Sequence, residues 1–151
     1  MKQQFYLLAK SSVLAATFIF LQSFSYKWGG DYFKVMLNGR VVTEQYLARP
    51  VPMSALSLTS SNKNDLLTIY YSHCGQAGKD RSISIKDGNG KILKEWRFND
   101  SKSQQMQLAV AEILNASLKQ NAVTLYYASK EVPTGRQIIT LNLSSIALLR
   151  R

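Results

Sequence analysis

The stretch Asp65–Phe98, DLLTIYYSHCGQAGKDRSISIKDGNGKILKEWRF, decides the fold that this sequence predicts. It contains three segments in which apolar and polar residues alternate, separated by glycine-bearing loops: 66–73, 81–86 and 91–98. Such alternation is typical of β-strands, because successive side chains point to opposite faces of a sheet. The stretch also holds the only histidine and the only cysteine of the chain, His73 and Cys74.

Similar alternation continues on both sides of this stretch. Asn38-Gly39 lies between two β-rich segments and predicts a two-residue hairpin turn, because both turn positions require positive φ. The register of that hairpin is expected to place Val35 opposite Val42. Ile92, in the last strand of the quoted stretch, is expected to face the core.

The complete pattern predicts about nine short strands within residues 32–145. Segment 104–119 fits both a strand and an amphipathic helix, and a weak internal repeat favours a strand over 105–110 followed by a helical turn over 111–119. Short strands at this spacing predict an all-β fold, namely an antiparallel β-sandwich with one short helical turn.

The internal repeat is a four-strand unit that occurs twice, followed by a closing strand. Its best match is between TIYYS at 68–72 and TLYYA at 124–128. If the chain is a duplication, Tyr71 and Tyr127 occupy equivalent places in the core, and the tyrosine before each of them faces outward. The alternative is that two alternating β segments resemble each other by chance.

The N-terminus has the pattern of a secretory signal peptide. Lysines precede an apolar run, VLAATFIFLQSF at 13–24, which is shorter than the about 20 residues of a membrane-spanning helix. Ser23 and Ser25 are small residues at the positions that favour cleavage between Ser25 and Tyr26. An uncleaved N-terminal anchor, which would be the only membrane attachment, is the alternative.

These features predict four parts of the chain and a location outside the cytoplasm. We expect an exported protein, periplasmic or extracellular, in which the signal peptide precedes a short linker, the folded domain and a tail. The parts are 1–25, 26–31, 32–145 and 146–151.

The mature chain is expected to be basic. Lys2 and Lys10 lie in the signal peptide, so 17 of the 19 basic residues remain beside 9 acidic ones, a formal charge of +8. This charge would suit an anionic partner at the envelope or outside the cell. The basic residues are scattered singly, however, so a solvated, soluble surface is the preferred explanation over a dedicated anion site, and no specific binding of nucleic acid is expected.

His73 and Cys74 are the only candidates for a catalytic pair. A cysteine nucleophile needs a base within hydrogen-bonding reach, but adjacent residues in a strand point to opposite faces. A bend at the end of the strand could remove this obstacle. The other interpretation is a half-buried histidine that packs beside Tyr71.

Other residues suggest binding rather than catalysis. The loop at 75–81 has two glycines and the basic residues Lys79 and Arg81, but lacks the spacing of a phosphate-binding P-loop, so only a weak anion contact is expected. Tyr70 and Tyr126 are expected to face solvent, where aromatic rings can stack on sugars or bases. Strands favour tyrosine in any case, so a purely structural role is the preferred interpretation of both. One histidine, one cysteine and dispersed acids predict neither a metal site nor a cofactor.

The segments YYSHCGQAGKDRSISIKD and GKILKEWRF resemble a group of small exported bacterial proteins that share the Cys-Gly loop and the Trp-x-Phe strand. This resemblance, over about residues 32–143, implies an envelope or extracellular location and brings no activity with it. We therefore expect a non-catalytic, exported β-sandwich with a binding or structural role. The alternative is a small secreted hydrolase with its site near His73 and the 74–81 loop.

Overall fold

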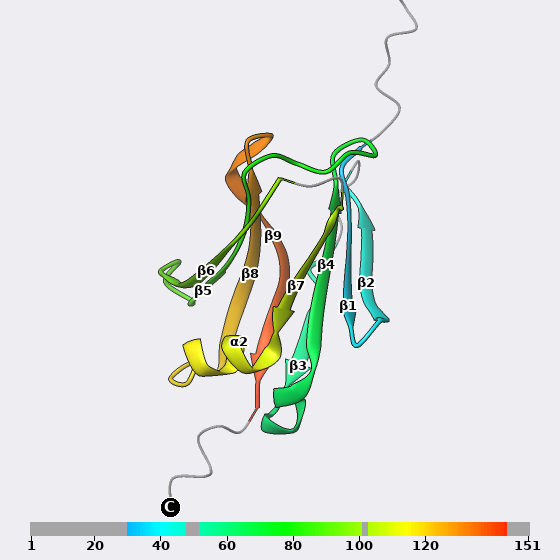
Figure 1. Cartoon of the computed structure of the whole chain (residues 1–151). Helices are drawn as coiled ribbons and strands as arrows, with labels where there is room; N and C mark the ends of the chain where they lie inside the picture. The colour runs from blue at the N-terminus through cyan, green and yellow to red at the C-terminus, as the bar shows by residue number, and fades with distance from the viewer. Residues whose placement is uncertain (1–29, 48–51, 101–102, 145–151) are drawn as a thin grey trace, which may run out of the picture.

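The computed structural model describes residues 30–47, 52–100 and 103–144, which form two β-sheets packed face to face (Figure 1). The four-stranded sheet has the order β2-β1-β4-β7 and the five-stranded sheet the order β3-β9-β8-β5-β6. The strands are β1 (Tyr32–Leu37), β2 (Arg40–Tyr46), β3 (Ala55–Leu58), β4 (Leu66–Ser72), β5 (Arg81–Lys86), β6 (Ile92–Phe98), β7 (Gln105–Ala109), β8 (Ala122–Ser129) and β9 (Val132–Leu143). The all-β sandwich prediction is confirmed.

The core lies between the sheets and is built by alternate residues of each strand. Along β8 every second side chain is buried, as the period of two requires. Each buried large apolar side chain contributes about 1.5–3 kcal/mol relative to an exposed one. Tyr71 and Tyr127 are both fully buried, as the repeat predicted, whereas Tyr70 and Tyr126 are half-buried on the outer faces.

The hairpin between β1 and β2 has the predicted turn, with φ of 50° at Asn38 and 79° at Gly39. The predicted pairing of Val35 with Val42 is wrong. A β-bulge places Val35 opposite Thr43, so that Val42 is the additional residue of the bulge.

The same kind of bulge occurs between β5 and β6, and it corrects a second prediction. Ile85 lies opposite Lys94 but Lys86 lies opposite Ile92, so Leu93 is the additional residue. Ile92 is exposed rather than buried, and Leu93 packs against the core in its place. A bulge reverses the alternation beyond it, which strict periodicity cannot anticipate.

The two halves of the chain repeat each other in register. The strand order β2-β1-β4 recurs as β6-β5-β8, and the pairing of Val35 with Ile69 recurs as that of Ile85 with Leu125. The bulge follows Val35 in one half and Ile85 in the other. This correspondence supports the duplication of a four-strand unit.

The third strand of each half lies in the other half's sheet. β3 belongs to the five-stranded sheet, and β7 pairs with β4 in the four-stranded one. The closing strand β9 is inserted between β8 and β3, which makes β3–β9 the one parallel pair of the described strands. The prediction of an antiparallel sandwich therefore needs this single correction.

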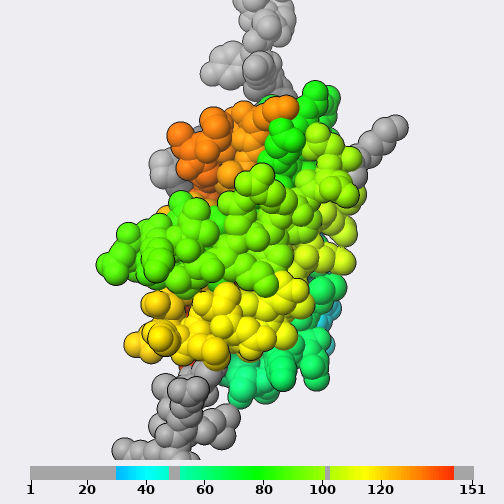
Figure 2. All heavy atoms as spheres, turned by 60° about the vertical axis from the view of Figure 1, so that its left-hand side comes forward, coloured from blue at the N-terminus to red at the C-terminus, as the bar shows by residue number. Residues whose placement is uncertain are grey.

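Two short helices follow the exchanged strands. Segment 105–109 is extended as predicted and leads directly into α2 (Val110–Ala116), while η1 (Ser60–Asn64) follows β3. Helix α2 contacts both η1 and β6, and Figure 2 shows it (yellow) between the β5–β6 region and η1. A continuous helix from Gln104 to Lys119, which would have excluded the duplication, is not formed.

Candidate functional site

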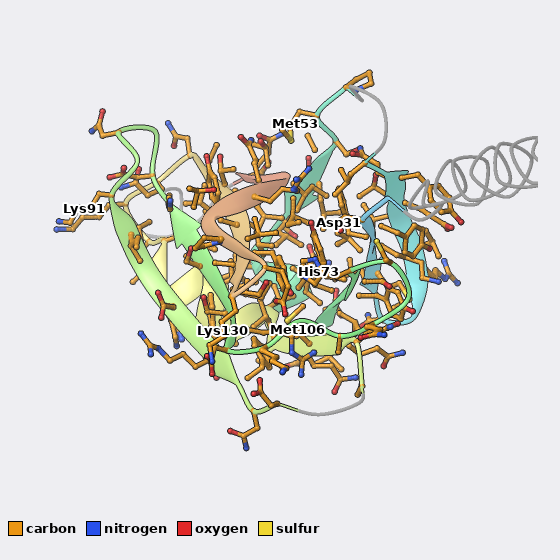
Figure 3. All side chains as sticks on the ribbon, turned by 90° about the horizontal axis from the view of Figure 1, so that it is seen from above. Asp31, Met53, His73, Lys91, Met106 and Lys130 are labelled. Carbon is orange, nitrogen blue, oxygen red and sulfur yellow. The ribbon has the colours of Figure 1, made fainter. Side chains whose placement is uncertain are left out.

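His73 lies just beyond the end of β4, in a polar cluster at one end of the sandwich. The carboxylate of Asp31, immediately before β1, is beside it (Figure 3). Asp31 Oδ2 is 3.2 Å from His73 Nδ1 and accepts a hydrogen bond of 2.9 Å from the Tyr71 hydroxyl. The Tyr71 ring is tilted against the imidazole at 4.9 Å between centroids. Asp31, which sequence analysis assigned to the linker, is thus part of the folded domain.

The other ring nitrogen of His73 faces the second half of the chain. Nε2 lies 2.9 Å from the Tyr127 hydroxyl and 3.2 Å from Ser129 Oγ, and Glu131 Oε2 is 4.0 Å away. In a neutral imidazole one nitrogen donates and the other accepts. In that neutral form, the carboxylate beside Nδ1 favours the proton on that atom, and Nε2 then accepts from a hydroxyl.

The cluster lies where the two repeats meet. Tyr71 and Tyr127 hold equivalent positions, and their rings stack at 3.9 Å between centroids with 11° between planes. His73 corresponds to Ser129 in the second half, and Asp31 corresponds to Arg81. Equivalent backbone positions therefore carry different chemistry in the two halves.

The electrostatics of the cluster keep its phenols protonated. Burial, and then the hydrogen bond to Asp31, raise the pKa of Tyr71. Burial also raises the pKa of Tyr127. The pKa of Glu131 is lowered overall. Burial acts to raise it, but this effect is outweighed by hydrogen bonds from Ser129 and from backbone amides and by the nearby His73. The tyrosine hydroxyls are therefore available as donors to Asp31 and His73.

The residues after His73 form a tight turn. His73 and Gln76 exchange backbone hydrogen bonds of 2.8 and 3.1 Å, and Cys74 and Gly75 between them have φ of 51° and 89°. Positive φ is uncommon for a residue with a side chain. The turn leaves Cys74 exposed at its tip, whereas the His73 side chain is only 12% exposed.

Gly78 covers the polar cluster. It is buried, and a Cβ atom at this position would meet the Tyr127 hydroxyl, His73 Nε2 at 2.9 Å and Glu131 Oε2 at 3.0 Å. The next residue holds the loop in place, since the Lys79 amide donates to Glu131 Oε2 at 3.1 Å. The main chain therefore occupies the space beside Nε2 that a substrate would need.

Replacing Gly78 by Ala is expected to destabilise the protein by about 1–3 kcal/mol, the usual cost of overpacking a closed site. The new methyl group must displace either the loop or the hydroxyl of Tyr127. Gly88→Ala is the matched control, because a Cβ at Gly88 meets no atom within 4 Å. Urea unfolding of both variants measures the difference, and equal midpoints would show that the loop does not rest on the cluster.

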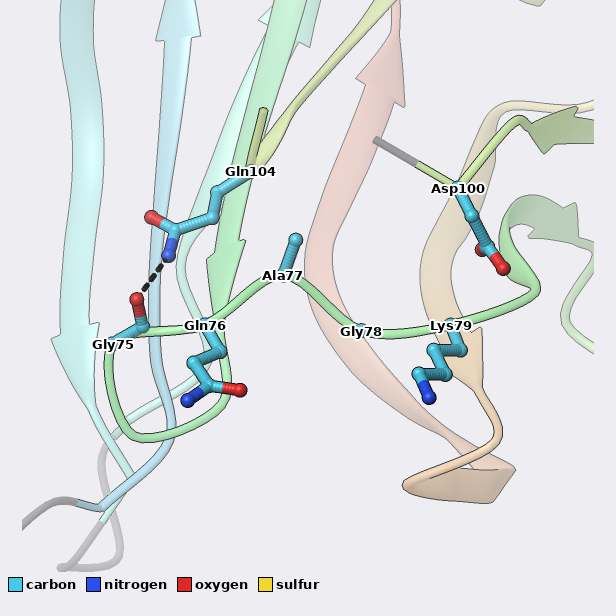
Figure 4. A pocket seen from close by; sticks show the side chains of 7 residues that line it. All are labelled: Gly75, Gln76, Ala77, Gly78, Lys79, Asp100 and Gln104. Carbon is cyan, nitrogen blue, oxygen red and sulfur yellow. Dashed lines mark hydrogen bonds between the residues drawn. The ribbon is translucent and has the colours of Figure 1, made fainter. Parts of the chain in front are cut away.

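A shallow pocket of about 550 Å³ lies on the outer side of this loop (Figure 4). The side chain of Gln104 borders it and donates a hydrogen bond of 2.6 Å to the Gly75 carbonyl. Lys79 and Asp100 supply charges of opposite sign. The lining residues are Gly75, Gln76, Ala77, Gly78, Lys79, Asp100 and Gln104. The mixed charge gives the pocket no preference for an anion.

The structure separates the two basic residues that the sequence suggested for an anion contact. Lys79 is exposed beside the pocket, whereas Arg81 is only 2% exposed. The guanidinium of Arg81 donates to the carbonyls of Ser103 at 2.7 Å and Asn99 at 2.9 Å. Arg81 therefore ties β5 to the connection between β6 and β7.

The candidate aromatic residues lie on opposite outer faces. Tyr126 is covered by Lys86, whose Nζ is 4.2 Å from the ring centroid. Tyr70 contacts the ring of Tyr32 on the neighbouring strand, and Tyr32 in turn contacts Tyr46; sequence reasoning missed both Tyr32 and Tyr46. The alternation around Phe33 and the hairpin could have identified both as outward-facing.

The remaining sequence predictions concern features outside this site. The cleavage residues Ser25 and Tyr26 lie outside the described residues. Within the described part of the chain, no group of three or more His, Cys, Asp or Glu side chains is arranged to hold a metal ion, and no helix is long and apolar enough to cross a membrane.

Comparison with known proteins adds no family to these observations. No protein-family model matches the chain, and no curated protein is similar to it in sequence. The resemblance to small exported bacterial proteins therefore stays a prediction.

Proposed function

We propose that this chain is a non-catalytic, exported β-sandwich that binds a partner at the cell envelope or outside the cell. The observation that carries the proposal is that Gly78 packs directly against the imidazole of His73, the only histidine of the chain. A general base must reach a substrate proton at about 2.6–3.2 Å. The hydroxyls of Tyr127 and Ser129 already lie at that distance from His73 Nε2, in the place that a substrate would have to occupy.

The polar cluster then has a structural role. It joins Asp31 from the start of the domain, His73 from the end of β4 and Ser129 from the end of β8. These residues cross-link the two sheets and hold the 74–80 loop on the end of the sandwich. Fully bonded polar networks of this kind favour one arrangement of a core.

A hydrolase remains the second candidate, because one observation favours it. Asp31, His73 and Ser129 lie in the order of an acid, a base and a nucleophile, with 3.2 Å at each step. Ser129 is buried, however, and the Tyr127 hydroxyl is closer to Nε2 than Ser129 is. This function would require the 74–80 loop to leave the cluster.

The test is an activity screen of the purified mature chain against ester, peptide and glycoside substrates. We expect no turnover above that of a Ser129→Ala, His73→Gln double variant. Circular dichroism and thermal melting must show that the variant is folded. Turnover that the double variant lacks would replace the binding protein with a hydrolase. Co-purification of the mature chain with its partner tests the binding role itself.

A further inference from the structure

Three tyrosines gather on the outer face of the four-stranded sheet. Tyr32 on β1 lies directly opposite Tyr46 on β2, and Tyr70 follows on β4, the strand on the other side of β1. We call Tyr32, Tyr46 and Tyr70 the tyrosine face. No second layer covers this side of the sheet among the described residues, where β1 and β2 form an open flank (Figure 1).

The rings of the tyrosine face contact one another and remain accessible. The centroids of Tyr32 and Tyr46 are 4.7 Å apart with 43° between planes, and those of Tyr32 and Tyr70 are 5.7 Å apart at 70°. Tyr46 is 67% exposed. The Tyr32 hydroxyl donates to Glu44 Oε1 at 2.7 Å, which fixes the ring beneath Tyr46. The face therefore presents a preformed aromatic surface.

The repeat shows that the fold does not require these tyrosines. In the second half, the positions equivalent to Tyr32 and Tyr46 hold Ser82 and Arg97. The strands there have the same order, register and bulge. Only Tyr70 has an aromatic equivalent, Tyr126. The aromatic pair is thus an addition to one face of a scaffold that forms without it.

The charges around the tyrosine face favour a neutral ligand. Lys34 lies opposite Glu44 in the register, and its Nζ is 5.7 Å from the centroid of the Tyr70 ring, so one cation and one anion border the face and its net charge is close to zero. Beyond Tyr70, β7 adds the exposed amides of Gln105 and Gln107. A polyanion would meet the carboxylate of Glu44 as well as the ammonium of Lys34, so the face offers it no net attraction. A sugar ring, in contrast, offers an apolar face to aromatic rings and hydroxyl groups to amides.

The size of the face favours a polymer chain over a folded partner. The four strands are spaced about 4.8 Å apart and are about six residues long, so the outer face of this sheet has an area of roughly 300–400 Å². A stable protein interface needs about 800 Å² on each partner, so neither a second copy of this chain nor another domain would be held by this face alone. A single polysaccharide chain can bind to a much smaller area than a folded protein.

We propose that the tyrosine face binds a neutral polysaccharide chain through stacking on Tyr46 and Tyr32 and hydrogen bonds from the neighbouring amides. This inference rests on the proposed binding function and names its surface and ligand class. The polymer lies across β2, β1 and β4, along the row of rings.

The experiment uses the whole mature chain and two variants that copy the second half, Tyr46→Arg and Tyr32→Ser. The neutral probes are swollen cellulose, chitin and soluble starch, and alginate is the anionic probe. Depletion assays and affinity electrophoresis measure binding. We expect the chain to bind at least one neutral probe, and each variant to bind it about tenfold more weakly or worse. Tyr126→Ala, on the opposite face, should bind like the unmodified chain.

Four results of the binding assays would overturn the inference. They are a lack of binding to all neutral probes, a preference for alginate that salt abolishes, binding that survives in folded Tyr46→Arg, and loss of binding in Tyr126→Ala. Since Tyr46 is exposed, its variant remains a valid test even where Tyr32→Ser melts early. Light scattering that shows a dimer dependent on Tyr46 would instead assign the face to a second copy. The proposed binding function is judged separately, by the activity screen and co-purification.

Discussion

Replacing Tyr127 by Ala is expected to lower the free energy of unfolding by about 3–5 kcal/mol, as for other large core aromatics. Tyr127 is fully buried and stacks on Tyr71 at 3.9 Å. Its hydroxyl is 2.9 Å from His73 Nε2, so the substitution also leaves a polar atom of the cluster with one partner fewer. This loss is a large share of the 5–15 kcal/mol that stabilises a typical domain.

Three further variants, compared with Tyr127→Ala, separate the contribution of the buried ring from that of its hydroxyl and from that of an outward-facing ring. Tyr71→Ala should cost about as much as Tyr127→Ala, because the two positions are equivalent. Tyr127→Phe keeps the ring and should cost only about 0.5–1.5 kcal/mol. Tyr70→Ala, on the outer face, should cost less than about 1 kcal/mol.

Urea unfolding followed by tyrosine and tryptophan fluorescence gives the values. If Tyr127→Ala does not fold, Tyr127→Leu retains enough apolar volume for the measurement. Equal costs for the inner and outer positions would contradict the stacked pair at the centre of the sandwich.

The fold was predictable because alternation and turn chemistry agree along the chain. Each half has a tight turn, a short β-rich segment and a TxYY strand, and the two TxYY strands indicated equivalent core tyrosines. Bulges were not predictable from that pattern. The extra residue at Val42 or Leu93 depends on how two strands twist against each other, which a single strand does not encode.

The site was predictable only in part, because its residues come from distant segments. His73 and its packing beside Tyr71 followed from the alternation of β4. Asp31 was assigned to the linker, since nothing local distinguishes it. Ser129 could have been found from the repeat, where it is the counterpart of His73. Exchange of the third strands between sheets is a long-range event that no local pattern specifies.

Replacing Arg81 by Met is expected to lower the free energy of unfolding by about 3 kcal/mol or more. Its buried guanidinium donates to two backbone carbonyls, and hydrogen bonds to charged groups contribute about 1.5–3 kcal/mol each. Methionine fills part of the volume but donates to neither carbonyl. The connection between β6 and β7 should then open more often than the rest of the sandwich.

Arg97 on β6 provides the matched control. Its side chain is 87% exposed and pairs with Glu95 at 2.9 Å, and surface pairs of this kind contribute about 0–1 kcal/mol. The urea midpoint of Arg97→Met should therefore be close to that of the unmodified chain. Arg81→Lys should lie between the two, because an ammonium keeps the charge but lacks the fork that reaches both carbonyls. Urea unfolding and amide exchange at Asn99 and Ser103 measure these effects. Equal stability of Arg81→Met and Arg97→Met would show that the Arg81 contacts do not hold the connection.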